Sequence, residues 1–155
     1  MKKFIAAVLL FSAFVTPTFA ADSSFYAGAQ VSDSYIGGFG GYQIDKMFSV
    51  EGHYYDFDSY SIPFRSTDVS SIGVAGVAMF PMTLDKLPPF SLFAKAGAER
   101  ITVKTFFTTY SATAHDIGLT LGGGAQYDSK YVSARLGLDV KGEADTLYVS
   151  ALYKF

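Results

Sequence analysis

The sequence has 155 residues, a formal net charge of −2 at pH 7 from 12 basic and 14 acidic side chains, and no cysteine. This mildly acidic balance excludes the basic surface of a nucleic-acid-binding domain, and the missing cysteine excludes disulfides, thiolate metal ligands and attachment of a lipid to cysteine. The length suits one domain, which must be held together by other means.

The first twenty residues have the pattern of a secretory signal peptide. Two lysines follow the initial methionine, an uncharged apolar run spans Phe4–Val15, and the small residue Ala20 ends the segment. The apolar run is shorter than the roughly 20 residues that a transmembrane helix needs. We therefore expect residues 1–20 to be removed during export and residues 21–155 to form the mature domain.

Segments of alternating apolar and polar residues, rich in Tyr, Phe, Val, Ile and Thr, follow one another from Phe25 to Phe155. A period of two residues is typical of β-strands, and no sustained period of 3.6 competes with it. The sequence therefore predicts an all-β domain. The expected strands are Phe25–Val31, Ile36–Ile44, Met47–Phe57, Val69–Phe80, Phe90–Val103, His115–Tyr127, Tyr131–Lys141 and Thr146–Phe155.

The connections between these eight strands are unequal. Residues 45–46, 82–89 and 128–130 form turn-like connections on one side, whereas the long connections 58–68 and 104–114 fall on the other side. An even number of strands, joined by alternating tight turns and longer loops, fits an eight-stranded antiparallel up-and-down transmembrane β-barrel whose two ends face different compartments.

Each expected strand carries its charges on one face and its large apolar residues mostly on the other. In the last strand, Leu147 and Val149 share one face, whereas Ser150 and Lys154 share the opposite face. The strand Val69–Phe80 is ambiguous because both of its faces are apolar. A soluble barrel of the lipocalin type would need a densely charged exterior, but the polar face here is dominated by Gly, Ser and Thr. Because the lumen of an eight-stranded barrel is only wide enough for its own side chains, we expect these small and charged residues inside and lipid outside.

Aromatic residues gather on the uncharged face at the strand ends that carry the tight turns. Such residues concentrate where a membrane barrel crosses the head-group region. The expected aromatic girdle comprises Phe25, Tyr42, Phe48, Phe80, Phe90, Tyr127, Tyr153 and Phe155. On the side of the long connections the pattern is less regular, with Tyr35, Tyr54 and Phe57 as candidates.

Ionisable residues on the lumen face could form a structural network or an active site, because clustered ionisable groups often mark catalysis. Unpaired charge in a confined interior is costly, so mutual pairing is the simpler interpretation. The expected lumen ion-pair network comprises Glu51, Lys95, Glu99, Arg135, Asp139 and Lys154, with His53 on the same face. We expect neither a cofactor nor a metal.

A lipid-A hydrolase is the sharper enzymatic hypothesis, because some outer-membrane barrels carry a Ser/His/acid site on the lipid-facing rim. Such a site needs a serine beside its histidine base. Neither His53 nor His115 lies in the His-x-Ser arrangement of those barrels, and the neighbours His115 and Asp116 point to opposite faces of a strand. The sequence therefore favours a protein without catalysis.

Four segments resemble strands of the transmembrane barrel of the outer-membrane protein A (OmpA) family and its small eight-stranded relatives. They are FYAGAQV at Phe25–Val31, FGGYQI at Phe39–Ile44, RLGLD at Arg135–Asp139 and VSALYKF at Val149–Phe155. The resemblance covers nearly all of the chain after the signal peptide. It implies a bacterial outer-membrane location, with outer-membrane lipid and lipopolysaccharide as partners. The closing strand, with Tyr153 and Phe155, is similar to the signal that the outer-membrane assembly machinery recognises.

The resemblance also implies roles for particular lumen residues. Glu51 and Arg135 match members of the ion pairs that cross the lumen in that family. Gln126 stands where the family has an acidic residue, and Val77 stands where it has a lysine. The charge-swap gate proposed for the family is therefore not carried over to this chain.

These observations predict a monomeric envelope component with a structural role and a filled lumen. The main alternative is recognition of an unidentified extracellular partner through residues 58–68 and 104–114, where Phe106, Phe107 and Tyr110 would stand outside the membrane. An exposed strand edge in that region could pair with such a partner. A small pore is limited by the narrow lumen.

Overall fold

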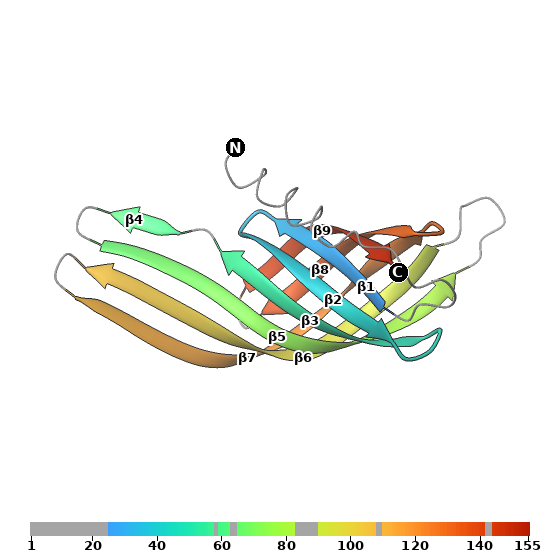
Figure 1. Cartoon of the computed structure of the whole chain (residues 1–155), viewed down its shortest axis with the longest axis horizontal. Coiled ribbons are helices and arrows are strands. Elements are labelled where there is room, and N and C mark those ends of the chain that lie inside the picture. Colours follow the sequence, from blue (N-terminus) through green and yellow to red (C-terminus); the bar gives the residue numbers. More distant parts are fainter. Residues whose placement is uncertain (1–24, 58, 63–64, 83–89, 108–109, 142–143) are drawn as a thin grey trace.

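The computed structural model describes residues 25–57, 59–62, 65–82, 90–107, 110–141 and 144–155 (Figure 1). The expected signal peptide, residues 1–20, lies outside these ranges. Within them, no helix is long and apolar enough to cross a membrane.

The described residues form one antiparallel sheet whose strands pair mostly with their neighbours in sequence. In chain order the strands are β1 (Phe25–Ser32), β2 (Tyr35–Gln43), β3 (Phe48–Phe57), β4 (Tyr60–Ile62), β5 (Arg65–Met82), β6 (Phe90–Phe107), β7 (Ser111–Asp128), β8 (Val132–Lys141) and β9 (Ala144–Lys154). All strands except the short β4 make up the wall of a closed barrel, because β3 pairs with β5 and β1 pairs with β9. The prediction of an eight-stranded antiparallel barrel is confirmed.

The seam between β1 and β9 closes the wall. The two strands pair from Tyr26 opposite Lys154 to Ser32 opposite Tyr148, and the amide of Phe155 donates a hydrogen bond to the carbonyl of Phe25 at 3.1 Å. Closure removes the sheet edges along the barrel, which is the condition for placing strands in hydrocarbon, where free backbone groups find no water.

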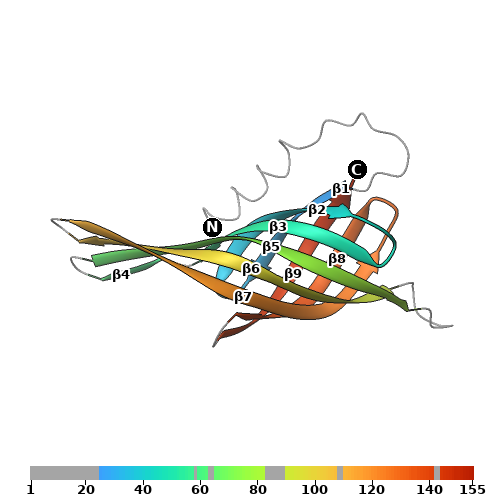
Figure 2. The ribbon, with the colours of Figure 1, turned by 90° about the horizontal axis from the view of Figure 1, so that it is seen from below.

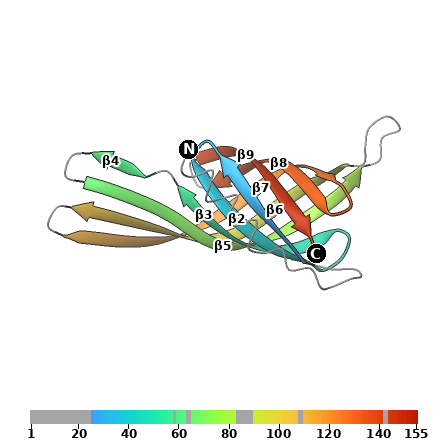
Figure 3. The same cartoon turned by 45° about the horizontal axis from the view of Figure 1, so that its top comes forward.

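Strands β5, β6 and β7 are each 18 residues long and project well beyond the rest of the barrel (Figures 1, 2 and 3). We call this projection the extension; it comprises β4 with residues 65–69 of β5, 101–107 of β6 and 111–119 of β7. The prediction that residues 58–68 and 104–114 are long loops is therefore wrong for most of those residues.

The pairing within the extension explains the error. Val69 lies opposite Val103, and Thr67 lies opposite Thr105, so that β-branched residues face one another across the ladder. Such cross-strand pairs stabilise a sheet, and they carry the hairpin beyond the point where the barrel wall ends.

The two faces of the barrel strands differ as the alternation predicts. In β3, Glu51 and His53 are buried in the lumen, whereas Val50 and Tyr54 are exposed on the outer face. The outer face of the barrel wall is mostly apolar, with Val74 of β5 as much as 61% exposed. The ambiguous strand β5 turns Ala75, Val77 and Ser71 inward and Ile72, Val74 and Phe80 outward. A continuous apolar exterior of this kind is typical of a surface that meets lipid.

The expected girdle residues lie at the turn-side end of the outer face. The rings of Phe25 and Tyr42 are 4.9 Å apart between centroids, and those of Tyr153 and Phe155 are 5.4 Å apart. Phe90 is half-buried, whereas the other members of the set are exposed: Phe25, Tyr42, Phe48, Phe80, Tyr127, Tyr153 and Phe155. At the other end, Tyr54 is exposed, but Tyr35 is only 3% exposed and faces the lumen. Tyr35 is therefore not a rim residue, because the barrel interior has room for its ring and partners for its hydroxyl.

Candidate functional site

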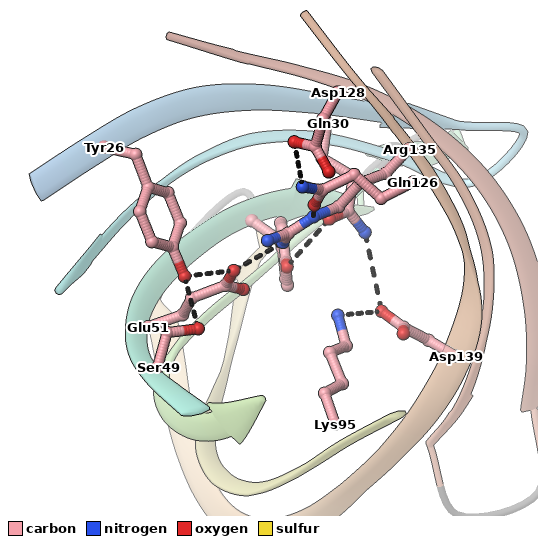
Figure 4. A network of polar contacts seen from close by, with 10 residues as sticks. Tyr26, Gln30, Ser49, Glu51, Lys95, Gln126, Asp128, Arg135 and Asp139 are labelled. Atoms are coloured by element: carbon pink, nitrogen blue, oxygen red, sulfur yellow. Dashed lines mark hydrogen bonds and ion pairs between the residues drawn. The ribbon is translucent and has the colours of Figure 1, made fainter. Parts of the chain in front are cut away.

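The lumen holds a layer of side chains centred on Arg135 of β8. Its Nη1 atom forms an ion pair with Oε1 of Glu51 on β3, and its Nε atom donates a hydrogen bond to Oε1 of Gln126 at 2.5 Å. All three side chains are buried (Figure 4). A guanidinium satisfied by a carboxylate and an amide can remain charged inside a narrow lumen.

Aromatic rings surround the Arg135 guanidinium. Its Cζ atom lies 5.6 Å from the ring centroid of Tyr26, 5.5 Å from that of Phe39 and 5.3 Å from that of Phe93. The Tyr26 hydroxyl donates a hydrogen bond to Glu51 at 2.8 Å. Cation–π attraction adds to the ion pair in such a desolvated position.

Asp128 connects this layer to the turn-side end of the lumen. Its Oδ1 atom accepts hydrogen bonds from Gln126 Nε2 at 2.7 Å, from Ser133 Oγ at 2.6 Å and from Lys154 Nζ at 2.6 Å. Since Gln126 also bonds to Arg135, the contacts form one chain from Lys154 to Glu51, and Figure 4 shows its part from Asp128 to Glu51. The Lys154 ammonium is about one-third exposed, which reduces the strength of its ion pair.

A second charged layer lies deeper in the barrel. Lys95 Nζ and Asp139 Oδ2 are 2.8 Å apart, and both side chains are almost completely buried. The same carboxylate oxygen accepts longer hydrogen bonds, at 3.4 Å, from Gln30 Nε2 and the Tyr35 hydroxyl. Lys95 Nζ also lies 4.9 Å from the ring centroid of Tyr148. The ammonium and the carboxylate therefore compensate each other away from water.

Glu99 lies beside His53 in the lumen. Their Oε2 and Nε2 atoms are 3.5 Å apart, and the imidazole stacks on the Tyr55 ring at a centroid distance of 4.7 Å. This histidine is buried, so it does not offer a base to a substrate on the outer rim.

The second histidine, His115, is on the extension. Its Nδ1 atom is 3.2 Å from the hydroxyl of Thr102, and both side chains lie on the outer face of the sheet. Asp116 pairs with Ile101 on the other face, so His115 and Asp116 do not form a dyad. Among the described residues there is also no group of three His, Cys, Asp or Glu side chains that could hold a metal ion.

A cavity of about 230 Å³ opens at the turn-side end of the barrel. Lys46 and Ser91 contribute to its walls, and its lining includes Arg135, Gln126 and Tyr26 from the Arg135 layer. The cavity is thus a shallow vestibule that reaches the first charged layer.

Comparison with known proteins identifies structures of similar fold but no protein of similar sequence. No protein-family model matches the chain, and no curated protein sequence matches it. Among solved structures, the N-terminal β-barrel domain of Pseudomonas aeruginosa OprF is similar with a TM-score of 0.65 and 12% identity, covering 84% of this chain and 95% of that domain. Neisserial surface protein A (NspA) gives a TM-score of 0.63 at 18% identity, covering 88% of this chain and 100% of NspA.

A third similar structure is Ail, the attachment invasion locus protein of Yersinia pestis, with a TM-score of 0.55 and 15% identity over 84% of this chain and 93% of Ail. The fold is that of the small eight-stranded outer-membrane β-barrels. At these identities the likeness establishes the architecture of the small outer-membrane barrels and leaves individual residue roles to the geometry of this chain.

Within this outer-membrane barrel fold, the residues expected to form one lumen network are divided among several contacts. Lys95 contacts Asp139, and Glu99 lies beside His53. Arg135 contacts Glu51 and is connected through Gln126 to Asp128, the partner of Lys154, which the sequence placed in a turn. Sequence reasoning also missed the large aromatic residues of the lumen, because it took the polar face of each strand to be mostly small.

Each of five lumen aromatics lies directly opposite a glycine on a neighbouring strand. The pairs are Tyr26 with Gly41, Phe39 with Gly28, Tyr55 with Gly37, Phe93 with Gly124 and Tyr148 with Gly137. A Cβ atom added to Gly137 would lie 2.6 Å from the Tyr148 ring, so the missing side chain is what admits the ring. The sequence contains this signal, but it becomes visible only once the strand register is known.

Proposed function

We propose that this protein is exported by residues 1–20 to the bacterial outer membrane and serves there as a monomeric structural barrel without catalysis. The observation that carries the proposal is the division of the wall into a mostly apolar outer face and a lumen in which buried charges contact opposite charges. A bilayer fits this division. In water, the exposed leucines and isoleucines of the outer face would be unfavourable, and so would the removal of so many charges from solvent.

The lumen is proposed to be filled rather than conducting. The Arg135 layer and the Lys95 layer each join side chains from non-adjacent strands. The aromatic rings of Phe93 and Tyr148 also pack together with Val77 in the lumen. An eight-stranded barrel leaves little space beyond its own side chains. Both charged layers would have to separate before a hydrated ion could pass.

Four measurements test this proposal. Cell fractionation and detergent dependence test the membrane location, and a protein that stays folded and dispersed in buffer without any amphiphile would contradict it. Planar-bilayer recording tests the filled lumen, for which we expect no stable conductance. Mass spectrometry of lipid A, with and without expression of the protein, tests the absence of hydrolase activity.

The partners proposed for this role are outer-membrane lipid, lipopolysaccharide and the outer-membrane assembly machinery. Tyr153 and Phe155 lie on or just after β9, the strand that closes the barrel, and both rings are on the outer face. We expect Tyr153→Ala with Phe155→Ala to reduce the amount of assembled barrel in cells more than refolding into detergent in vitro. Equal losses in both would argue against recognition by the machinery.

Surface recognition is the second candidate function, and the extension is the observation that favours it. Phe106 and Tyr110 are exposed near its tip, while Phe107 stacks on Tyr110 with 4.5 Å between ring centroids. Ail, which shares the fold, is an attachment invasion locus protein, and one of its structures is a complex with the heparin analogue sucrose octasulfate. An extension standing in water could offer a comparable contact surface.

A shortened variant tests this candidate. Thr102 and His115 lie opposite each other, so joining them by a two-residue Asn-Gly turn would remove the tip and keep the hairpin. We expect this variant to assemble normally and to lose binding of cells to host surfaces or matrix. Unchanged binding by the shortened protein would remove the recognition function and leave the structural one in place.

A further inference from the structure

The extension has one covered edge and one open edge. On the β5 side, Tyr60–Ile62 of β4 pair with Arg65–Thr67 and cover the edge. On the other side, β7 pairs with β6 from Ser111 to Tyr127 but with β8 only from Thr120 onward. Among the described residues, 111–119 of β7 therefore have a strand partner on one side only.

This edge lacks the devices that usually protect an open strand. Residues 111–119 read SATAHDIGL, with no proline, no lysine and a single carboxylate, that of Asp116. Protected edges are commonly short or carry lysine, proline or a bulge, whereas this edge continues a regular ladder for nine residues. The amide of Ile117 donates a hydrogen bond to Oδ1 of Asp116 at 2.9 Å, which an added strand would have to replace. The other N–H and C=O groups that point away from β6 are offered to another strand.

The two faces of the extension differ in chemistry beside this edge. On the outer face, Asp68 and Lys104 are exposed, and so are Ile117 and Leu119 of the edge strand, at 79% and 75%. The inner face, which continues the lumen side of the wall, carries Val69, Ile101 and Val103. An added strand would thus meet charged and apolar residues on the outer face and mainly apolar residues on the inner face.

The residues of β7 on the inner face are small. Ala112 and Ala114 lie opposite Thr105 and Val103 of β6, and Gly118 lies opposite Glu99. Large apolar side chains on an added strand could extend over these alanines and contact Val103. Asp116, between Ala114 and Gly118 on the same face, favours a basic side chain directly opposite it.

We propose that residues 111–119 of β7 bind an extended segment of another polypeptide as an additional antiparallel strand. This strand would lie in line with β8, because the β7–β8 ladder ends at Thr120 opposite Lys141 and the open edge begins at the next residue. Reading along the bound segment, a lysine or arginine would face Asp116, and large apolar residues would follow at alternate positions opposite Ala114 and Ala112. The inference rests on the second candidate function, because the open edge must stand in water.

The probe is a synthetic peptide, Lys-Thr-Ile-Thr-Val-Thr with blocked ends, added to the refolded protein in detergent micelles. Amide hydrogen exchange is followed by mass spectrometry. We expect the peptide to slow exchange within residues 111–116, which it faces in this register, by about fivefold or more. The same peptide with proline in place of isoleucine should have no effect, because proline cannot donate to the ladder and disfavours the extended pairing.

Two protein variants make the test specific. Ala114→Lys places a charge on the inner face of the open edge and should weaken peptide binding by about tenfold or more. Ser66→Lys adds the same charge to β5, away from the edge, and should leave binding within about twofold. Both variants must first show the heat resistance of the parent barrel.

Several results of this experiment would overturn the proposal. Absence of protection at millimolar peptide, protection confined to β4 and β5, or equal binding to Ala114→Lys would each overturn the proposal. Protection of 111–119 that grows with protein concentration alone would identify a second copy as the occupant and overturn it as well. Because the measurement uses purified protein in detergent, its failure is distinct from a failure of membrane location or of cell binding.

Discussion

Arg135 and Glu51 form an ion pair between strands that are not neighbours in the wall, since β9, β1 and β2 separate β8 from β3 on one side of the barrel. The pair therefore crosses the lumen and ties two opposite parts of the wall together. Both side chains are buried, so neither charge can turn to water if the other is removed.

Replacing Arg135 with methionine should lower the free energy of unfolding by about 3–5 kcal/mol, because the substitution leaves the Glu51 carboxylate buried without its cation. Equilibrium unfolding in urea, followed by the mobility of the folded barrel on gels, measures this loss. The double variant with Glu51→Gln should recover part of it, since the unpaired charge is then gone. A loss below about 1 kcal/mol would show that the pair is not important for stability.

Replacing Lys154 with alanine tests a more exposed ion pair at the turn-side end of the lumen. Its partner Asp128 also accepts hydrogen bonds from Gln126 and Ser133, and the ion pair is about one-third exposed. We expect a loss of about 0–1 kcal/mol in the same unfolding experiment. A loss as large as that of the Arg135 variant would contradict the distinction between the two contacts.

Adding a methyl group at Gly137 should destabilise the barrel by about 1–3 kcal/mol, because a Cβ there would lie 2.6 Å from the Tyr148 ring and 3.0 Å from the Phe93 ring. Gly76→Ala is the matched control, since its nearest neighbour would be the Ala96 carbonyl oxygen at an ordinary 3.9 Å. Thermal unfolding of the two variants in the same detergent compares them directly. Equal melting temperatures would disprove the close packing of rings over glycines.

Leu136→Arg tests what surrounds the outer face. Leu136 is 54% exposed, so arginine at this position would change stability by less than about 0.5 kcal/mol if the face met water. In the apolar core of a bilayer the same change should cost about 2–4 kcal/mol. Unfolding from lipid vesicles measures the difference, with Ser66→Arg on the extension as the control that should have little effect.

Substituting Phe93 and Tyr148 together with alanine should open the lumen. These rings pack with Val77 and contact the Arg135 and Lys95 side chains, so their loss would leave both charged layers loosely held. We expect ion-conducting events in planar bilayers that the parent protein does not show. Leu136→Ala, on the outer face, serves as the control. A folded double variant that shows no conductance would mean that the charged layers block ion passage without the two rings.

The alternation of residues in strands such as β8 and β9 was enough to predict the barrel and the direction of its faces. Each face is a local property, since successive side chains point to opposite sides whatever the partner strand is. For the same reason, the placement of Glu51, Lys95, Arg135 and Asp139 on the lumen side follows from parity alone.

Two features could not be predicted because they depend on register and on pairing at a distance. Parity within β9 places Tyr148 on the lumen side, but the space for its ring comes from Gly137 on β8, which only the strand register reveals. The length of β5–β7 depends on three segments continuing to pair after their neighbours have ended, so 104–114 read as a loop from sequence alone. The partner of Lys154 was missed because Asp128 looked like an ordinary turn residue.

The seam between β1 and β9 joins segments that are more than a hundred positions apart in the sequence. The cylinder therefore cannot be completed until β9 has been delivered, and every earlier arrangement of the strands leaves two unprotected sides. Contacts of such long range form slowly, which prolongs the period in which misassociation competes with insertion. A substitution that weakens only this seam should thus lower the yield of inserted barrel before it alters the finished molecule.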